Sequence, residues 1–477
     1  MADGSGDGQS EVETSAGSVL HNRHFLLLWM AQAISQTAQN AIWFGLMVVV
    51  EEATRSSTQL GLAVLTTILP AIFLGIIAGV FVDRMNKKTV LVTTNALRGL
   101  AVLGYLLYGR AIYFVYLINL VFCSISQFFG PAEASTIPQL VPRRHLITAN
   151  SLFNLTFTGS QMAGLVIIGP PLIKLFGPET LFVVAALVYM AAAGLVWFLP
   201  PGIPPQRSLS ELRRATVVRA VWAEIKEGWS FIESDRKTAL AMVHLTLVAG
   251  LMLVMSMLAP RFVVDVLGIR ADDAVYIFAP AGAGILLGTS LVGRLAARFG
   301  KTALVNVGLV IMGGSMLVLA ALRWLSAIFP YSIAAFLGTS QLPRAVGMVP
   351  AMLVLAGIIG FNFALVTIPA QTVVMEQAPV STRGRIFAVQ MMLGNLASVL
   401  PLLFLGGLAD VFGIDATMGV VGLVILAVAA YSIRHSRLPV PARAPAALRG
   451  LGDQSSMGVG SEAGTETTKW AGGHLEK

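Results

Sequence analysis

Long apolar segments separated by short polar connections make up most of the chain. Segments of about eighteen or more residues with few charges recur between residues 25 and 433. As a helix, a segment of this length crosses the roughly 30 Å hydrocarbon core of a bilayer. Because that core holds no water, the backbone groups of each span must bond to one another, and these runs are too long and too continuously apolar for barrel strands. The pattern therefore predicts an all-α membrane protein.

The apolar segments define twelve predicted spans in two sets of six. The first set lies near Phe25–Val50, Gln59–Val82, Thr89–Tyr108, Ile112–Gln139, Asn150–Phe176 and Leu181–Leu199. The second set lies near Ala239–Val264, Ala274–Ala297, Ala303–Leu322, Val349–Val374, Ile386–Ala409 and Gly419–Ile433.

Polar segments divide the chain further. We expect a disordered cytoplasmic leader at residues 1–22, the first six-helix bundle at 23–200, a cytoplasmic linker at 201–236, the second bundle at 237–434 and a disordered cytoplasmic tail at 435–477. Residues 323–348 hold apolar stretches too short to span, which indicates an outer loop lying along the membrane surface. The linker is expected to be an amphipathic surface helix, because its apolar residues recur at helical spacing: Val218, Trp222, Ile225, Trp229 and Ile232.

Charge sets the orientation. The chain is 56% apolar and 12% charged, with a net charge of +8. In a soluble protein that charge would favour nucleic acid, but here 17 Lys and Arg residues fall at the connections on the side of the termini and 7 on the other side. The bias predicts cytoplasmic N- and C-termini and no nucleic-acid partner. Cys123 is the only cysteine, so an intrachain disulfide is excluded.

The two sets of spans carry related loops. The connection after span two runs from Gly79 to Lys88, and the one after span eight from Gly293 to Lys301. A single offset of 214 residues aligns the Gly, the Arg and the following Lys of the two loops. Duplicated six-helix halves are an established transporter architecture, with the substrate bound between the halves near mid-membrane.

The first loop resembles motif A of the major facilitator superfamily, G-x-x-x-D-R-x-G-R/K-R/K. A short loop between two spans needs a tight turn and a close helix approach, which explains Gly79. Asn86 replaces the usual second Gly, and Asn also tolerates a left-handed turn. The second copy has Ala297 in the acidic position. The residues that match are Gly79, Asp83, Arg84, Lys87 and Lys88 in the first loop and Gly293, Arg298, Gly300 and Lys301 in the second.

The resemblance extends from about Arg23 to Arg434 and implies two pseudo-symmetric six-helix halves. Further residues resemble the branch that contains enterobactin exporters and macrolide efflux pumps: the stretch from Pro131-Ala132 to Pro142, then Ala149-Asn150, and later Arg383-Gly384-Arg385. In this family motif A latches the halves together in the outward-facing state. The resemblance therefore implies that Asp83 faces a helix N-terminus and that Glu133 pairs with Lys87, whereas the alternative is that the loop cations only fix topology.

Polar residues and methionines within the spans are candidates for the lining of a substrate cavity. Polar side chains are costly in a span, so they face either a cavity or a neighbouring helix. Methionines adapt to varied apolar ligands. In this family spans one, four, seven and ten line the cavity. The candidates are Gln32, Gln36, Gln39, Asn40 and Trp43 in span one, Met252 and Met255 in span seven, and Asn362 in span ten.

Charged residues in the spans are candidates for coupling and gating. His244 can titrate near neutrality, although a lone His more often hydrogen-bonds a neighbour. Arg98 needs a carboxylate or carbonyl partner, and Glu376 lies near the inner end of span ten. Arg261 and Asp265 stand four residues apart, so they can form a helical ion pair that acts either as an outer gate or only as a surface contact.

Other family motifs are incomplete. Gly159, Gly164, Gly169 and Pro170 resemble motif C of antiporters, except that Ile173 replaces the final Gly. The Arg of motif B is absent near Cys123, so proton coupling is a hypothesis. The sequence contains no complete Walker A, dinucleotide-binding, metal-binding or catalytic-nucleophile motif. We therefore expect no enzymatic activity and no cofactor.

The sequence thus predicts a monomeric secondary transporter of the bacterial inner membrane, in contact with lipid, that exports an amphipathic small molecule by proton antiport. The alternatives are an importer, a lysophospholipid flippase, or a non-transporting sensor that uses the linker and the tail.

Overall fold

The computed structural model describes residues 20–107, 111–142, 145–200, 236–268, 270–328, 344–377 and 383–436. Within these ranges every regular element is helical, and twelve helices are long and apolar enough to cross a membrane. The predicted fold class is therefore confirmed. The leader to residue 19, the linker at 201–235, most of the loop at 323–348 and the tail from 437 lie outside the described residues.

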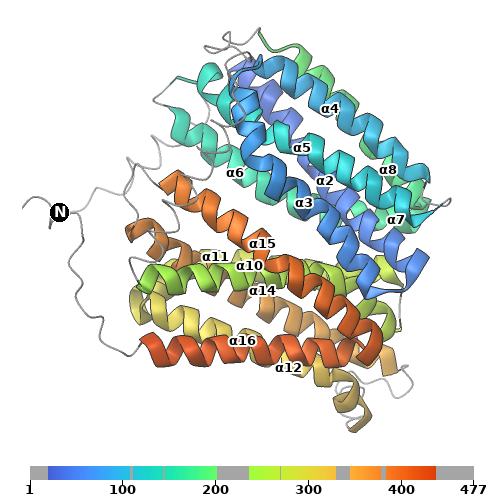
Figure 1. The fold of residues 1–477 in the computed structure, drawn as a ribbon, viewed down its shortest axis with the longest axis vertical. Helices are drawn as coiled ribbons and strands as arrows, with labels where there is room; N and C mark the ends of the chain where they lie inside the picture. Colours follow the sequence, from blue (N-terminus) through green and yellow to red (C-terminus); the bar gives the residue numbers. More distant parts are fainter. Residues whose placement is uncertain are drawn as a thin grey trace, which may run out of the picture. The chain divides into compact units, whose positions relative to one another are not determined.

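The first bundle holds the helices drawn from blue to green in Figure 1. Span five is divided into three elements, of which the middle one (η3) is a π-helix. The elements are α2 (Arg23–Thr54), α3 (Ser57–Asp83), α4 (Lys87–Leu103) with η1 (Gly104–Leu107), α5 (Ile112–Leu140), α6 (Leu146–Met162), η3 (Ala163–Ile168), α7 (Gly169–Phe176) and α8 (Pro178–Trp197).

The second bundle holds the helices drawn from yellow-green to red. Its last span begins about five residues earlier than predicted, at Ile414. The elements are α10 (Arg236–Asp265), η5 (Ala271–Ala274), α11 (Val275–Phe299), α12 (Lys301–Ile328), α14 (Arg344–Gln377), α15 (Arg383–Phe412) and α16 (Ile414–Ser436).

Equivalent helices pack alike in the two bundles. The second span packs on the fourth in both, as α3 on α5 and α11 on α14, and the third on the sixth, as α4 on α8 and α12 on α16. Gly284 and Gly288 make the α11–α14 contact close: a Cβ on either would lie within 3 Å of α14 atoms. Glycines at these positions thus let the two helix backbones approach closely.

The π-helix of span five explains why Pro170 is tolerated within it. Pro170 has no N–H and cannot continue a regular helical ladder. The backbone widens ahead of it, and the N–H of Gly169 bonds to the carbonyl of Gly164, five residues back. This bulge brings η3 against α2.

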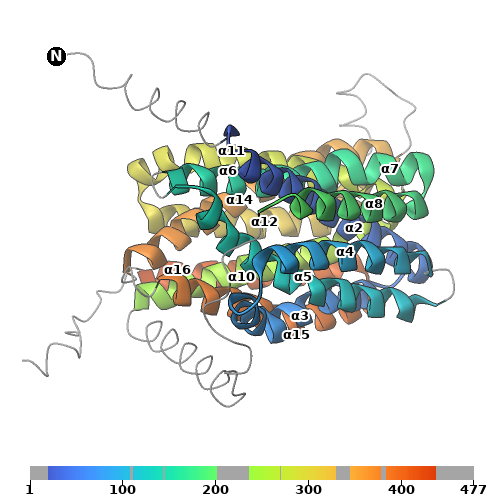
Figure 2. The ribbon, with the colours of Figure 1, turned by 90° about the horizontal axis from the view of Figure 1, so that it is seen from above.

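The two bundles meet along two pairs of equivalent helices. The second span of the first bundle, α3, packs on the fifth span of the second bundle, α15 (Figures 1 and 2). Reciprocally, η3 of span five packs on α11, the second span of the other bundle. The end with the α3–α4 connection is called here the motif A end, and the end with the α2–α3 connection the opposite end.

Candidate functional site

A cavity of about 420 Å³ lies between the two bundles. Helices of both bundles contribute to its walls: α2, α3, α5, α6 and η3 from the first, and α10, α11, α12, α14 and α16 from the second. A site built from both halves changes shape when the halves move relative to each other. This is the arrangement needed to release a ligand on either side of a membrane.

Amides and hydroxyls supply the polar part of the wall. None of the described residues that line the cavity carries a formal charge. Such a wall can hydrogen-bond a neutral polar group but offers no counter-ion to a strongly charged ligand. Its polar members are Gln39, Asn40, Thr67, Asn119, Gln161 and Ser256.

Methionines and aromatic rings stand among aliphatic side chains in the apolar part of the wall. Flexible thioethers and flat rings accommodate ligands of different shape. The methionines are Met162, Met252, Met255, Met352 and Met418, and the rings belong to Trp43, Phe122, Phe262, Phe278 and Phe363.

Asn119 holds one side of the cavity in place. Its Nδ2 donates to the hydroxyls of Thr66 and Thr67 on α3, both at 2.8 Å, and its Oδ1 accepts from the Tyr105 hydroxyl at 2.8 Å. The Asn119 side chain is only 2% exposed. A buried amide satisfied by partners from several elements fixes their spacing, so this network sets the distance between α3 and α5 beside the cavity.

Five of the eight predicted cavity residues line the cavity: Gln39, Asn40, Trp43, Met252 and Met255. Gln32 and Gln36 lie toward the motif A end of α2, where α6 covers the helix: the Ser160 hydroxyl donates to the Ala33 carbonyl at 3.1 Å. Asn362 is buried and donates to the Ile358 carbonyl of its own helix at 2.8 Å. These three side chains do not line the cavity, although their polarity within a span had suggested that they would.

Asn119 and Gln161 line the cavity from spans four and five and were not predicted to do so. Both are polar residues inside apolar spans. The criterion applied to span one would have found them had it been extended to every span.

The cations of motif A bind backbone carbonyls in this structure. Lys87 donates to the carbonyls of Val82 at 2.6 Å and Met85 at 3.2 Å, and Arg84 donates to that of Val80 at 2.8 Å. Lys88 donates to the Leu199 carbonyl at 2.6 Å. The three cations therefore cap the C-terminal ends of α3 and α8, where the helix dipole favours positive charge.

Two expectations about the motif A turn are wrong. Asn86 is not left-handed: its φ is −66°, and its side chain caps α4 by accepting from the Thr89 N–H. Gly79 makes no close helix approach, because a Cβ at this position would meet no atom within 4 Å. Asp83 is exposed at the end of α3. Among the described residues, neither Asp83 nor Lys87 takes part in an ion pair, so the expected contact between Lys87 and Glu133 is not made in this conformation.

Arg98 is buried and Glu133 is half-buried within the first bundle. The Arg98 guanidinium donates to the Ser126 carbonyl at 3.3 Å and lies 4.4 Å from the centre of the Phe129 ring. The Oε1 atom of Glu133 is buried without a hydrogen-bond partner among the described residues, and Arg98 is the cation whose field acts on it. A buried carboxyl held near a cation without direct contact is a group that can take up and release a proton.

The remaining coupling candidates differ in their surroundings. His244 is buried, and its Nε2 has no hydrogen-bond partner within the described part of the chain. Glu376 forms an ion pair with Lys301, which joins the second motif A copy to the end of α14. In that copy Gly300 has a φ of +82°, and Arg298 lies 5.4 Å from the Phe299 ring. A Cβ at Gly293 would meet nothing within 4 Å.

The predicted pair at the opposite end is confirmed. Arg261 Nε lies 2.5 Å from Asp265 Oδ2. The guanidinium also reaches across to α2, where its Nη1 is 3.6 Å from Oε1 of Glu51, a carboxylate only 2% exposed. A second ion pair, Lys174 with Asp273 at 2.7 Å, also joins the two bundles.

Comparison with known proteins agrees with this architecture. Residues 28–346 match the family model described as Major Facilitator Superfamily. The uncharacterised MFS-type transporter YfiS of Bacillus subtilis is 24% identical over 375 residues, which cover 78% of this chain and 83% of YfiS. The multidrug efflux pump Tap of Mycolicibacterium fortuitum is 24% identical over 427 residues, which cover 87% of this chain and 96% of Tap.

Solved structures show the same fold. A bacterial homologue of the human lysosomal transporter Spinster, in an inward-facing and occupied conformation, aligns with a TM-score of 0.64 at 15% identity and covers 88% of this chain and 98% of its own. The nucleoside transporter NupG aligns with a TM-score of 0.62 at 11% identity and covers 87% of this chain and 99% of its own.

Proposed function

Since this chain belongs to the Major Facilitator Superfamily and is a membrane transporter, we propose that it exports an amphipathic small molecule of low net charge by alternating access. Export is favoured by the similarity to the multidrug efflux pump Tap and by the resemblance of span five to the antiporter motif C. The bacterial inner membrane is the proposed location, because the relatives with a printed source are bacterial.

The cavity wall is the observation that carries the proposal. It combines five methionines and five aromatic rings with four carboxamides, and its described members include no ionic side chain. Uncharged or singly charged amphiphiles with an aromatic or aliphatic body suit this wall. Multiply anionic molecules such as catecholate siderophores do not, because they would lose hydration without gaining a counter-ion.

Orientation follows from the loop charges. With both termini cytoplasmic, the motif A end faces the cytoplasm and the opposite end faces outward. The ion pairs between the bundles, Glu51 with Arg261 and Lys174 with Asp273, then lie at the outer end. At the motif A end the described residues form no ion pair between the bundles. This distribution supports a conformation closed to the outside, ready to load substrate from the cytoplasm.

Proton antiport is part of the proposal, and buried carboxyls are the groups suited to it. Glu133 and Glu51 both place an oxygen out of solvent with no hydrogen-bond partner among the described residues. Each also lies near one arginine, Arg98 or Arg261. Binding a proton would neutralise the carboxyl and weaken its attraction to that arginine, which couples protonation to helix position.

Ligand binding to the purified full-length protein tests the proposed substrate class. Thermal stabilisation is measured with matched neutral, singly cationic and multiply anionic amphiphiles. We expect the first two groups to stabilise the protein and the third to leave it unchanged. Stabilisation by the multiply anionic compounds alone would contradict the proposal.

Import and lipid flipping are tested in the same preparation. Proteoliposomes with a labelled lysophospholipid in one leaflet report flipping, and loss of a preloaded dye from expressing cells reports export. The sensor alternative depends on the linker and the tail, which lie outside the described residues. Transport that survives deletion of residues 450–477 would argue against a role for the tail.

A further inference from the structure

Asp410, near the end of α15, binds the first turn of α3 in the other bundle. Its Oδ1 accepts from the Ser57 N–H at 2.6 Å and its Oδ2 from the Thr58 N–H at 3.0 Å. The hydroxyl of Ser56, the N-cap residue of α3, donates to the same Oδ2 at 2.7 Å. One carboxylate thus takes three hydrogen bonds from the start of a helix to which it is not connected.

This contact suits the chemistry of a helix start. The first N–H groups of a helix have no partner within it, and the N-terminal end of the helix dipole favours a negative charge. Ser56 already caps α3 by accepting from the Gln59 N–H. Asp410 satisfies the donors that Ser56 leaves free, so the N-terminus of α3 is complete only while α15 is against it.

Two glycines allow the helices to meet closely at this point. A Cβ on Gly406 would lie 3.0 Å from the Ser57 carbonyl oxygen and from the Thr58 Cα. A Cβ on Gly61 would lie 3.1 Å from the Leu402 carbonyl oxygen. Next to Gly406, a Cβ on Gly407 would meet nothing within 4 Å. Gly406 therefore lies on the α15 face that contacts α3, and Gly61 lies on the α3 face that contacts α15.

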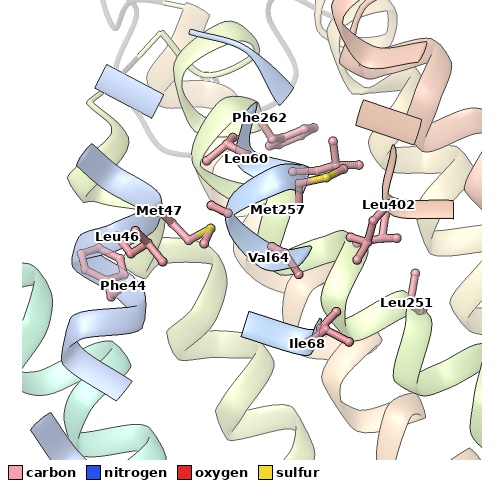
Figure 3. Close-up of a cluster of buried hydrophobic side chains, with 14 of the residues drawn as sticks. Phe44, Leu46, Met47, Leu60, Val64, Ile68, Leu251, Met257, Phe262 and Leu402 are labelled. Atoms are coloured by element: carbon pink, nitrogen blue, oxygen red, sulfur yellow. The ribbon is translucent and has the colours of Figure 1, made fainter. Parts of the chain in front are cut away.

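An apolar seam continues this contact along the helices. Figure 3 shows Leu60 and Val64 of α3 gathered with Met257 and Phe262 of α10 and with Leu402 of α15. All five side chains are at most 1% exposed. The seam does not depend on charge, so the Asp410 contact can be removed without unpacking it.

At the other end of the same helix pair, the aspartate belongs to α3 and the helix start belongs to α15. Asp83 is the last residue of α3, and α15 begins at Arg383 near that end. α3 and α15 run antiparallel, so Asp83 belongs to the motif A end of the pair and Asp410 to the opposite end. In this structure Asp410 is engaged, while Asp83 is exposed with no hydrogen bond among the described residues.

We propose that Asp410 is a conformational latch that holds the opposite end of the transporter closed by capping α3, as a counterpart to the Asp83 latch that the family resemblance implies at the motif A end. Rocking of the bundles that separates α15 from α3 at the opposite end breaks the three Asp410 hydrogen bonds. The same motion brings the α15 start toward Asp83 at the motif A end. The helix pair then has two exclusive arrangements, each stabilised by one carboxylate on one helix start.

Distances between spin labels at each end test the latch without any substrate. The labels are placed on exposed side chains in a Cys123→Ala background: Tyr113→Cys with Val411→Cys at the opposite end, and Phe198→Cys with Phe299→Cys at the motif A end. Asp410→Asn should shift the population toward a longer distance at the opposite end and a shorter one at the motif A end. The expected change in the ratio of the two states is about three- to tenfold.

Asp415→Asn is the matched control. Asp415 lies at the same end, but its partner Arg323 belongs to its own bundle, at 3.4 Å. It should leave both distance distributions as in the parent protein. Equal distributions in the Asp410→Asn and Asp415→Asn variants would overturn the latch.

A pair of glycine variants tests the same contact by another route. Gly406→Val should push α15 away from α3 and open the opposite end, whereas Gly407→Val should not, because the new side chain meets open space. Gel filtration and circular dichroism check that each variant is folded. If Gly406→Val is folded and keeps the parent distances, the close contact does not control the conformation and the proposal fails. Neither experiment depends on the proposed substrate, so failure of the latch leaves the proposed function untouched.

Discussion

Gly164 of the π-helix lies against Asn40 of α2, a residue of the cavity wall. A Cβ atom on Gly164 would come within 2.6 Å of the Asn40 Cβ and 2.5 Å of the Thr37 carbonyl oxygen. No flexible side-chain end is available to move aside, so the position of this cavity wall depends on the absence of a side chain at Gly164.

Gly164→Val should therefore lower both stability and ligand binding. The added side chain must push η3 away from α2, at a cost of about 1–3 kcal/mol or more. Thermal unfolding in detergent and ligand titration measure the two effects. Gly159→Val is the control, because a Cβ there would meet nothing within 4 Å, and it should behave as the parent protein. Equal effects of the two substitutions would contradict this account of the wall.

Trp43→Ala should weaken ligand binding by about tenfold or more, because a tryptophan that contacts a ligand in a buried site contributes about 2 kcal/mol or more. Trp43 lines the cavity, whereas Trp197 is 65% exposed at the end of α8. Trp197→Ala removes the same side chain away from the cavity and should leave the affinity unchanged. Titration by calorimetry compares the two. A loss of affinity in Trp197→Ala alone would mean that the ligand binds elsewhere.

Asn119→Ala should destabilise the first bundle by about 1–3 kcal/mol, because it leaves the Tyr105, Thr66 and Thr67 hydroxyls without their shared partner. In a double-mutant cycle with Tyr105→Phe, the two losses should be non-additive because the residues share a hydrogen bond. Thermal unfolding of the four proteins measures the coupling. Strict additivity would mean that the Tyr105–Asn119 bond contributes nothing to stability.

Glu133→Gln should uncouple substrate movement from protons while preserving binding, because the amide cannot take up a proton but keeps the shape of the carboxyl. Glu376→Gln is the control. Glu376 is paired with Lys301 and 57% exposed, so its removal should change stability by less than about 1 kcal/mol and leave coupling intact. Substrate-induced proton release in detergent distinguishes the two. Normal proton release by Glu133→Gln would exclude Glu133 as the coupling group.

The sequence determined the fold more fully than it determined the site. Spans are specified by local composition, since each segment must satisfy its own backbone in lipid, and all twelve were located to within a few residues at most ends. The π-helix before Pro170 was not predicted, because the widening depends on how η3 packs against α2.

The roles of individual side chains could be assigned only once the packing of the helices was known. The periodic polar stripe of α2 placed Gln39, Asn40 and Trp43 correctly, but it did not show that α6 covers the part of α2 that bears Gln32 and Gln36. The contact between Asp410 and α3 joins residues more than 350 positions apart. Spacing along the chain carries no signal for such a contact. In contrast, the pair of Arg261 and Asp265 was predictable because both lie on one helix face.

Proton-coupled export through this cavity is tested most directly by substrate accumulation in proteoliposomes under a proton gradient. Vesicles containing the full-length protein are given an acidic interior and a panel of neutral and singly cationic amphiphiles, with vesicles containing the Trp43→Ala variant as the control. At least one compound should accumulate in parent vesicles, a protonophore should abolish the accumulation, and Trp43→Ala should reduce it by about tenfold. Absence of gradient-driven accumulation for every compound, in vesicles whose protein is shown to be folded, would contradict proton-coupled export through this cavity.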